Sequence, residues 1–144
     1  MATKKRVYFA APLFSEAEIT YNEYLEAILS KHFEVFLPQR DNGLVFNEIT
    51  AGKDKSLAFK EIFNGDLAAI KCCDILFIVL DGRTIDEGAC FELGYAFSLG
   101  KICIGLRTDT RQLMEFGNNP MIINALSSIF GNPKELEDWA LKNG

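Results

Sequence analysis

The sequence predicts a single α/β domain, in which helices cover both faces of an open, mainly parallel β-sheet. Short apolar runs alternate with helical patterns along all 144 residues, which is typical of consecutive β-α-β units. The run from Asp74 to Leu80 is apolar and rich in β-branched residues after its first position, as in a strand buried on both faces. A hydrophobic content of 49% is enough for one core, but the chain is too short for two full domains.

Proline and hydrophobic spacing mark the first elements. Residues 6–11 are rich in strand-forming side chains and end at Pro12. Residues 16–31 place apolar side chains at helical spacing, with charges between them. Residues 33–37 form a short second strand that stops at Pro38. The polar segment that begins at Gln39 predicts a loop to about Gly52.

The second half of the chain continues the alternation. A helix is expected over residues 55–72, followed by the buried strand 74–80 and the turn Asp81-Gly82. The next helix carries Glu92 and ends at Gly100, because glycine commonly stands just past a helix end. The remaining expected elements are a strand over residues 102–106, a short helix after Asn118-Asn119-Pro120, a weak strand over 127–130, and a helix from Pro133 to about Lys142.

The composition excludes several classes of partner. The net charge is -5, whereas nucleic acids and anionic membranes require a basic surface. No apolar segment is long enough to span a bilayer. The basic start Lys4-Lys5-Arg6 is followed by a short run that contains Pro12, so we interpret it as a first strand and not as a signal peptide. A cytoplasmic protein is the expectation.

Cysteine and histidine give little support to metal or triad chemistry. The four cysteines, at positions 72, 73, 90 and 103, have no paired metal-ligand spacing, and free thiols in a reducing cytosol are the favoured interpretation. The one histidine, His32, closes a predicted helix, where a cation suits the helix dipole. Neither a Gly-x-Gly-x-x-Gly fingerprint nor a Walker-type Gly-Lys-Ser/Thr sequence occurs. We therefore expect no metal and no dinucleotide or triphosphate cradle.

Glu92 stands out because it places a carboxylate on an otherwise apolar stretch of helix. Its neighbours at helical spacing are small or aromatic, namely Gly88, Ala89, Tyr95 and Ala96. A buried carboxylate needs partners or a chemical role. One interpretation is a structural carboxylate that is hydrogen-bonded to a neighbouring helix or to Arg83. The other is a shielded nucleophile or general base to which Tyr8 donates a hydrogen bond, unless Tyr8 is an ordinary strand aromatic.

The start of the Glu92 helix has capping-box spacing. Thr84 is the expected N-cap, with Glu87 at the third helical position. Asp86 is either a residue that complements the helix dipole or a functional carboxylate, and spacing alone does not separate the two. Gly88 and Gly94 each cost the helix about 1 kcal/mol relative to alanine, so we expect another backbone or a ligand to come close there.

Several motifs, taken in order and with their separations, resemble the nucleoside 2-deoxyribosyltransferase family over residues 8 to about 122. They are Tyr8-Phe9-Ala10-Ala11-Pro12-Leu13-Phe14, Asp66 in Asn64-Gly65-Asp66-Leu67, Asp74, Asp81-Gly82, Asp86 with Gly88, and Glu92-Leu93-Gly94-Tyr95-Ala96. The resemblance implies a flavodoxin-like, Rossmann-like three-layer sandwich around a five-stranded sheet. It also implies an enzyme that exchanges the base of 2'-deoxynucleosides with free purine or pyrimidine bases, without a metal or a cofactor.

The resemblance implies roles for individual residues. Glu92 matches the nucleophile that attacks the anomeric carbon and holds a covalent deoxyribosyl intermediate, so we expect it to be shielded and ionised. Tyr8 matches the tyrosine that orients this glutamate. Asp66 matches the carboxyl group that protonates the departing base and takes a proton from the incoming one. Asp86 matches a residue that binds the sugar hydroxyls, and Gly88 lets the sugar come close.

Further positions are implied to contact the substrate. Asn119, in Asn119-Pro120-Met121, matches the asparagine that reaches the sugar 5'-hydroxyl in a neighbouring subunit's site, and Asn118 is the alternative register. Gln39 and Asp41 fall where the second loop of the family meets the base. A site that borrows a residue from a neighbour implies a homo-oligomer, a dimer or a hexamer, with composite active sites.

Two other functions remain open. A 2'-deoxynucleoside 5'-monophosphate N-glycosidase would use the same glutamate with water as the acceptor, and it should carry a Gly/Ser-rich phosphate cradle after the first strand. Ala10-Ala11-Pro12-Leu13 stands there, and Pro12 has no N–H. The second alternative is a non-catalytic nucleotide-binding module, because a fold does not fix a function. Such a module would not need Glu92.

Overall fold

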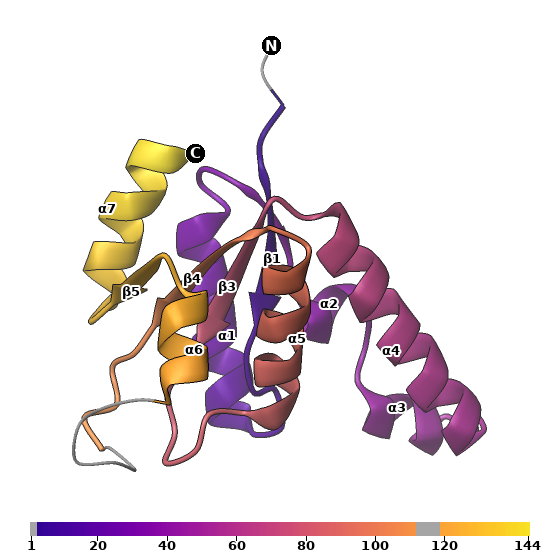
Figure 1. The fold of residues 1–144 in the computed structure, drawn as a ribbon. Coiled ribbons are helices and arrows are strands. Elements are labelled where there is room, and N and C mark those ends of the chain that lie inside the picture. The colour runs from indigo at the N-terminus through magenta and orange to yellow at the C-terminus, as the bar shows by residue number, and fades with distance from the viewer. Residues whose placement is uncertain (1–2, 112–118) are drawn as a thin grey trace.

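The computed structural model describes residues 3–111 and 119–144, and its centre is a five-stranded sheet in which all neighbouring strands are parallel (Figure 1). The strands are β1 (Arg6–Ala10), β2 (Glu34–Phe36), β3 (Ile75–Val79), β4 (Ile102–Leu106) and β5 (Ser128–Phe130). Their order is β2-β1-β3-β4-β5, which is the flavodoxin-like order of doubly wound folds. The predicted fold class and all five predicted strands are confirmed.

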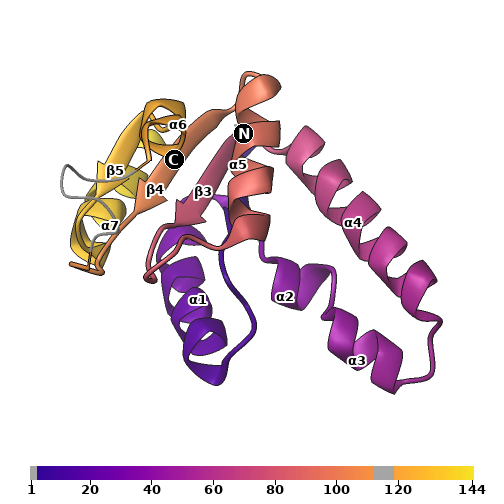
Figure 2. The same ribbon diagram turned by 60° about the horizontal axis from the view of Figure 1, so that its bottom comes forward.

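Helices cover both faces of the sheet and complete three layers (Figure 1, Figure 2). On one face lie α1 (Glu16–Leu29) and α7 (Pro133–Asn143), and on the other lie α4 (Lys55–Cys72), α5 (Glu87–Ser98) and α6 (Pro120–Ala125). Two short helices, α2 (Pro38–Asp41) and α3 (Val45–Thr50), connect β2 to α4. Within the described ranges, no helix has both the length and the apolar character needed to cross a bilayer.

The pleat of the strands divides the core into two clusters. In β1, Val7 and Phe9 pack with α1 and α7, whereas Tyr8 and Ala10 pack on the opposite face with α5. All residues of β3 are buried, as expected for a central strand of a parallel sheet. The pleat therefore directs the Tyr8 side chain into the layer of helices that contains Glu92.

The chain changes direction across the sheet between β1 and β3. It runs from β1 outward to β2, returns through α4 to β3, and then continues the other way to β4 and β5. The carboxyl ends of β1 and β3 are neighbours, with Ala10 paired to Ile78. Ligands of open α/β sheets bind in the crevice at such a reversal, so this edge of the sheet is where we look for a site.

The predicted loop over residues 39–52 is wrong, because this segment contains α2 and α3. Pro38 occupies the first turn of α2, where its missing N–H has no cost, and Asp41 Oδ2 accepts a hydrogen bond from the Leu37 N–H at 2.8 Å. In neither helix does the side chain of the N-cap residue accept a capping hydrogen bond. The usual sequence signal for a helix start is therefore missing from both.

The predicted capping box at the start of α5 is also wrong. The helix begins at Glu87 and its N-cap is Asp86, whose Oδ2 accepts a hydrogen bond from the Ala89 N–H at 2.8 Å. Thr84 lies two residues before this cap and is exposed. Aspartate caps helices at least as well as threonine, so the helix starts later than the spacing of Thr84 and Glu87 suggests.

Candidate active site

Tyr8 and Glu92 lie together on the α5 side of the sheet. The Tyr8 side chain is fully buried and stacks against Phe36 of β2, with ring centroids 5.6 Å apart. Its hydroxyl and Glu92 Oε2 are both buried. The hydroxyl is near enough to lower the pKa of Glu92, but neither atom has a partner at full hydrogen-bond geometry in the described chain. Buried polar atoms are nearly always paired in folded proteins. Two unpaired atoms side by side therefore mark a place suited to the polar groups of a ligand.

Asp66 is the third member of this group. It lies on α4, and its negative charge, together with that of Glu92, adds to the effect of burial in raising the pKa of the Tyr8 hydroxyl. Strand β1 and helices α4 and α5 therefore bring together the three side chains that the sequence selected as catalytic. Their roles stay predictions, but their proximity is a property of the fold.

A purely structural role for Glu92 has no support among its contacts. No hydrogen bond from a neighbouring helix reaches Oε2, and among the ion pairs of the described residues none joins Arg83 to Glu92. Arg83 itself is exposed. A carboxyl oxygen that is buried without a structural partner is costly, and such a group is typical of a functional site.

The surroundings of Glu92 favour the protonated form of its carboxyl group. Burial raises its pKa to about 8; the nearby Tyr8 hydroxyl acts in the opposite direction, and the charges of Asp66 and Asp86 raise the pKa further. Burial therefore opposes ionisation of Glu92 in the unliganded chain, and the ionised carboxylate stays a prediction. Because this pKa is close to neutral, deprotonation of Glu92 to the carboxylate that a nucleophile requires costs only a small free energy near pH 7.

Asn42 holds Asp66 in place, and the sequence analysis missed it. Its Nδ2 donates hydrogen bonds to Asp66 Oδ1 at 2.9 Å and to the Ile62 carbonyl at 2.8 Å. Burial raises the pKa of Asp66, while the Asn42 amide and the Tyr8 hydroxyl act to lower it. Asn42 belongs to the segment that looked like a polar loop, so only the packing of this segment against α4 reveals the contact.

Asp86 and Gly88 lie at the first turn of α5. The Asp86 carboxylate caps the helix, and its charge is one of the causes that raise the pKa of Glu92. A Cβ atom on Gly88 would lie 3.2 Å from Asp86 Oδ2, which is closer than ordinary van der Waals contact. The missing side chain at position 88 thus leaves room for the capping carboxylate. Asp86 is a structural cap whose charge acts on the Glu92 carboxyl group.

The amide of Gln39 is bonded to α1 at both ends. Its Nε2 donates to the Ile19 carbonyl at 3.1 Å, and its Oε1 accepts from Asn22 Nδ2 at 3.0 Å. Asn22 is only 2% exposed, and the same Nδ2 donates to the Pro12 carbonyl at 2.9 Å. This cluster fastens α2 and the loop after β1 to α1. Gln39 therefore stabilises the second loop, and a contact of its amide with a base would compete with these bonds.

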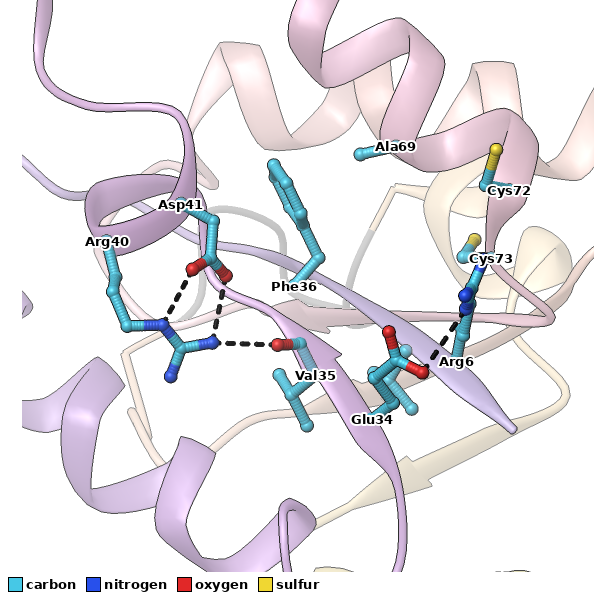
Figure 3. Close-up of a pocket in the computed structure, with 10 residues that line it drawn as sticks. Arg6, Glu34, Val35, Phe36, Arg40, Asp41, Ala69, Cys72 and Cys73 are labelled. Carbon is cyan, nitrogen blue, oxygen red and sulfur yellow. Dashed lines mark hydrogen bonds and ion pairs between the residues drawn. The ribbon is translucent and has the colours of Figure 1, made fainter. Parts of the chain in front are cut away.

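The carboxylate of Asp41 is also hydrogen-bonded within the chain, to Arg40 and to the Leu37 N–H. Figure 3 shows the Arg40 guanidinium between the Asp41 carboxylate and the Val35 carbonyl, and Nη2 lies 2.8 Å from each acceptor. The hydrogen bond from the Arg40 side chain is the main reason that the pKa of Asp41 is lowered. These residues border a pocket of about 390 Å³ along β2, in which Arg6 and Glu34 form a second ion pair at 3.3 Å. The charges of Arg40, Asp41, Arg6 and Glu34 in this pocket are thus paired with one another, whereas the Tyr8 hydroxyl and Glu92 Oε2 have no such partner in the described chain.

Asn119 caps α6 and is exposed. Its Oδ1 accepts a hydrogen bond from the Met121 N–H at 2.9 Å, and Met121 is 79% exposed. Helix α6 packs against α5, so this exposed pair stands next to the helix that carries Glu92. Asn118, the alternative register, lies outside the described residues.

Comparison with known sequences agrees with this geometry. Residues 7–136 match a family model described as Nucleoside 2-deoxyribosyltransferase. A protein of Ureaplasma parvum that is described as uncharacterized is 31% identical over 106 residues, which is 70% of this chain. The match spans 65% of the length of that relative.

Two solved structures extend the comparison. A 2-deoxyribosyltransferase from Bacillus psychrosaccharolyticus is 28% identical, with a TM-score of 0.76, and the match covers 92% of this chain and 90% of that one. A CMP N-glycosidase from Clostridium botulinum is 26% identical, with a TM-score of 0.58, over 94% of this chain and 96% of that one. The family match covers most of the chain, and the fold and the buried carboxyl groups agree with it. The protein belongs to the nucleoside 2-deoxyribosyltransferase family.

Proposed function

We propose that the protein is a nucleoside 2-deoxyribosyltransferase, which exchanges the base of 2'-deoxynucleosides through a covalent deoxyribosyl-Glu92 intermediate. The observation that carries this proposal is the buried Tyr8 hydroxyl and Glu92 Oε2, without hydrogen-bond partners in the described chain and close to Asp66. Burial of an unpaired carboxyl oxygen costs free energy, and a module that only binds nucleotides has no need of it. A nucleophile, in contrast, must be shielded from water and free of strong hydrogen bonds. Membership of the family supports the same proposal.

In the first half of the proposed reaction, the Glu92 carboxylate attacks the anomeric carbon on the face opposite the base. The Glu92–carbon bond forms as the glycosidic C–N bond breaks, and the electron pair of that bond leaves with the base. Protonated Asp66 gives its proton to the departing base, which would otherwise leave as an anion. Burial raises the pKa of Asp66, which favours the protonated form that this step needs.

In the second half, an incoming base attacks the same carbon from the side that the first base left. The proton of the incoming base passes to the Asp66 carboxylate as the new C–N bond forms, and Glu92 departs as a carboxylate. Two displacements at one carbon retain the configuration of the starting nucleoside. The Tyr8 hydroxyl, buried near both carboxyl groups, is suited to donate a hydrogen bond to Glu92 when the carboxylate is released.

Contacts with the sugar and the base complete the proposal. Asp86 is proposed to bind the sugar hydroxyls, and Gly88, in the same first turn of α5, is proposed to let the sugar come close. Gln39 and Asp41 are proposed to border the base, and their bonds within the chain would fix the shape of that subsite through α2. The exposed Asn119 is proposed to reach the 5'-hydroxyl in a neighbouring subunit's site.

A shared site requires a homo-oligomer, and we propose a dimer or a hexamer. Helices α4 and α5 expose large apolar side chains, among them Phe59, Phe63 and Phe91, which are 49–56% exposed. Phe63 and Phe91 contact each other, with ring centroids 6.1 Å apart. Contiguous exposed apolar side chains are typical of surfaces that bind another protein chain. These aromatic residues therefore support a subunit contact beside the helices that carry Asp66 and Glu92.

We also propose that the enzyme works in the cytoplasm. Its four cysteines are free thiols, and Cys73 and Cys103 are buried. Free thiols are stable in a reducing compartment, whereas an oxidising one tends to pair them.

Hydrolysis of a 2'-deoxynucleoside 5'-monophosphate is the second candidate function, and the similarity to a CMP N-glycosidase favours it. In that reaction water, in place of a base, would attack the deoxyribosyl ester of Glu92. A 5'-phosphate needs N–H groups or hydroxyls after β1. Pro12 there has no N–H, and its carbonyl oxygen accepts a hydrogen bond from Asn22. We therefore prefer base exchange.

Incubation of the protein with deoxyinosine and free adenine, followed by chromatography, separates these candidates. Formation of deoxyadenosine together with hypoxanthine supports base exchange. Release of hypoxanthine with free deoxyribose supports hydrolysis, as does release of base from deoxynucleoside monophosphates alone. Absence of turnover across a panel of purine and pyrimidine deoxynucleosides and their monophosphates contradicts both enzymatic proposals.

The Glu92→Ala variant tests the proposed nucleophile. We expect the exchange rate to fall by about 10³-fold or more, because the proposed covalent intermediate cannot form without the Glu92 carboxylate. The matched control is Glu87→Ala on the exposed side of the same helix, which should keep its activity. Circular dichroism and thermal unfolding check that both variants fold. Near-normal exchange by folded Glu92→Ala would remove Glu92 from the mechanism.

A further inference from the structure

We infer that Asn42 positions the acid–base group, and that it selects Oδ2 of Asp66 as the oxygen that carries the transferred proton. The inference rests on the proposed function, because it refines the role given there to Asp66. Asn42 is the residue that follows α2, and it contacts α4 from outside that helix. A residue of the segment between β2 and α4 thus controls the chemistry of a carboxyl group on another element.

The orientation of the Asn42 amide follows from its two partners. The Ile62 carbonyl lies 2.8 Å from Nδ2, and Asp66 Oδ1 lies 2.9 Å from the same atom. A carbonyl oxygen accepts hydrogen bonds and cannot donate them, so the amide atom that meets the Ile62 carbonyl must be Nδ2 and not Oδ1. Both hydrogens of Nδ2 are then used, one on the helix backbone and one on Asp66. The first bond anchors the amide, and the second holds the carboxyl group.

Gly65 makes this close approach possible. A Cβ atom at position 65 would lie 2.5 Å from Asn42 Oδ1 and 2.9 Å from both Cγ and Nδ2. Those distances are far below ordinary contact, so any larger residue would displace the amide. Glycine is less favourable than alanine inside a helix such as α4. Gly65 is needed here because the absence of a side chain leaves space for the Asn42 amide directly beside Asp66.

The hydrogen bond decides where the proton of Asp66 resides. Oδ1 accepts the Asn42 N–H, and a carboxylic acid donates from its other oxygen, so the proton lies on Oδ2. The same bond stops the carboxyl group from rotating between the two halves of the reaction. Oδ2 therefore gives its proton to the departing base and later receives the proton of the incoming base. The Asn42 amide also opposes the effect of burial on the pKa of Asp66, which helps the acid to release its proton.

Two substrates distinguish this role from general support of the fold. The base of deoxyinosine needs a proton as it leaves, whereas the cationic base of 7-methyl-2'-deoxyguanosine leaves as a neutral molecule without one. We expect Asn42→Ala to lower kcat for base release from deoxyinosine by about 10- to 100-fold. Release from 7-methyl-2'-deoxyguanosine should fall by less than about threefold, and Asp66→Asn should give the same pattern. Equal losses on both substrates would overturn the inference.

The Gly65→Ala variant removes the same contact while Asn42 stays in the chain. We expect it to reproduce the substrate pattern of Asn42→Ala, because the new Cβ displaces the amide. Gly94→Ala is its matched control, since a Cβ atom there meets nothing within 4 Å. Asn47→Ala, at an exposed position on α3, is the control for the loss of an asparagine side chain. Both controls should keep the wild-type ratio of the two rates.

A titration that needs no turnover separates this inference from the proposed function. Carbon-13 NMR of labelled aspartate follows the Asp66 carboxyl group in the wild-type protein and in Asn42→Ala. We expect the midpoint for Asp66 to move upward by about one pH unit in the variant, because the bond that favours its ionised form is gone. An unchanged midpoint would overturn the inference even in an active enzyme. A protein inactive on every nucleoside would contradict the proposed function, and the titration would still decide the role of Asn42.

Discussion

The carboxyl group of Glu92 keeps its proton in the folded chain at pH values where an exposed glutamate has lost it. Its ordinary pKa of 4.5 is raised to about 8, chiefly by burial. Between these two values the folded chain binds more protons at Glu92 than the unfolded chain does. The free energy of unfolding therefore falls as the pH rises from about 4.5 to 8, by an amount of a few kcal/mol.

The Glu92→Gln variant tests this pH dependence. The amide has nearly the same shape and cannot ionise, so the contribution of Glu92 disappears. We expect the variant to unfold at a higher urea concentration than the wild type at pH 8, and the advantage to shrink toward pH 5. Glu87→Gln, on the exposed side of α5, should show the wild-type pH dependence. An identical pH dependence in Glu92→Gln and the wild type would contradict the raised pKa.

Single residues were predictable from the sequence where their chemistry is unusual for their position. Glu92 could be selected because a carboxylate interrupts an apolar helix, and Tyr8 and Asp66 because they complete a motif. Asn42 could not, since its importance comes from a contact with a helix that follows more than ten residues later. The hydrogen bonds of the Gln39 amide could not be predicted either, because its partners, Ile19 and Asn22, lie on α1.

The helices between β2 and α4 are the elements that hydrophobic periodicity and capping signals did not predict. Long elements such as α4 and α5 were predicted within a few residues, because their periodicity extends over several turns. Helices α2 and α3 are too short for periodicity to reveal, and their N-caps, Leu37 and Leu44, carry no capping side chain. Their positions are fixed by tertiary contacts. One of these is the hydrogen bond from Asn42 Nδ2 to the Ile62 carbonyl of α4 at 2.8 Å, and another is the Asn22 cluster.

Replacement of Asn22 by alanine tests the attachment of these elements to α1. The change leaves the Pro12 carbonyl and Gln39 Oε1 without their shared donor. We expect the free energy of unfolding to fall by about 1–3 kcal/mol in urea denaturation. Asn124→Ala is the control, because that exposed side chain bonds only within its own helix, to the Pro120 carbonyl. A stability of Asn22→Ala equal to that of the control would show that the cluster contributes little.

The whole molecule is a doubly wound sheet whose reversal point lies between β1 and β3, next to the unpaired atoms of the site. The alternation of strands and helices predicted the parallel sheet. It did not predict the order β2-β1-β3-β4-β5, because strand neighbours depend on contacts between distant segments. The number of subunits is a further property of the whole molecule, and the exposed aromatic residues of α4 and α5 support more than one.

Mixing two impaired variants tests whether neighbouring subunits share each site. In an oligomer that combines Glu92→Ala and Asn119→Ala chains, some sites would pair an intact Glu92 from one chain with an intact Asn119 from its neighbour. After co-refolding in equal amounts, we expect up to about a quarter of the wild-type exchange activity to return. Activity no greater than the mean of the separate variants would show that each chain forms its site alone.

The most direct test of the central claim is the mass of the protein during turnover. The enzyme is mixed with 2'-deoxyinosine in the absence of an acceptor base, quenched in acid and analysed by intact mass and peptide mapping. We predict an increase of about 116 Da, the mass of one deoxyribosyl group, on the peptide that contains Glu92. The increase should vanish when adenine is added and should never form in Glu92→Gln. Steady exchange with no adduct on that peptide, or an adduct on another residue, would contradict Glu92 as the group that carries deoxyribose.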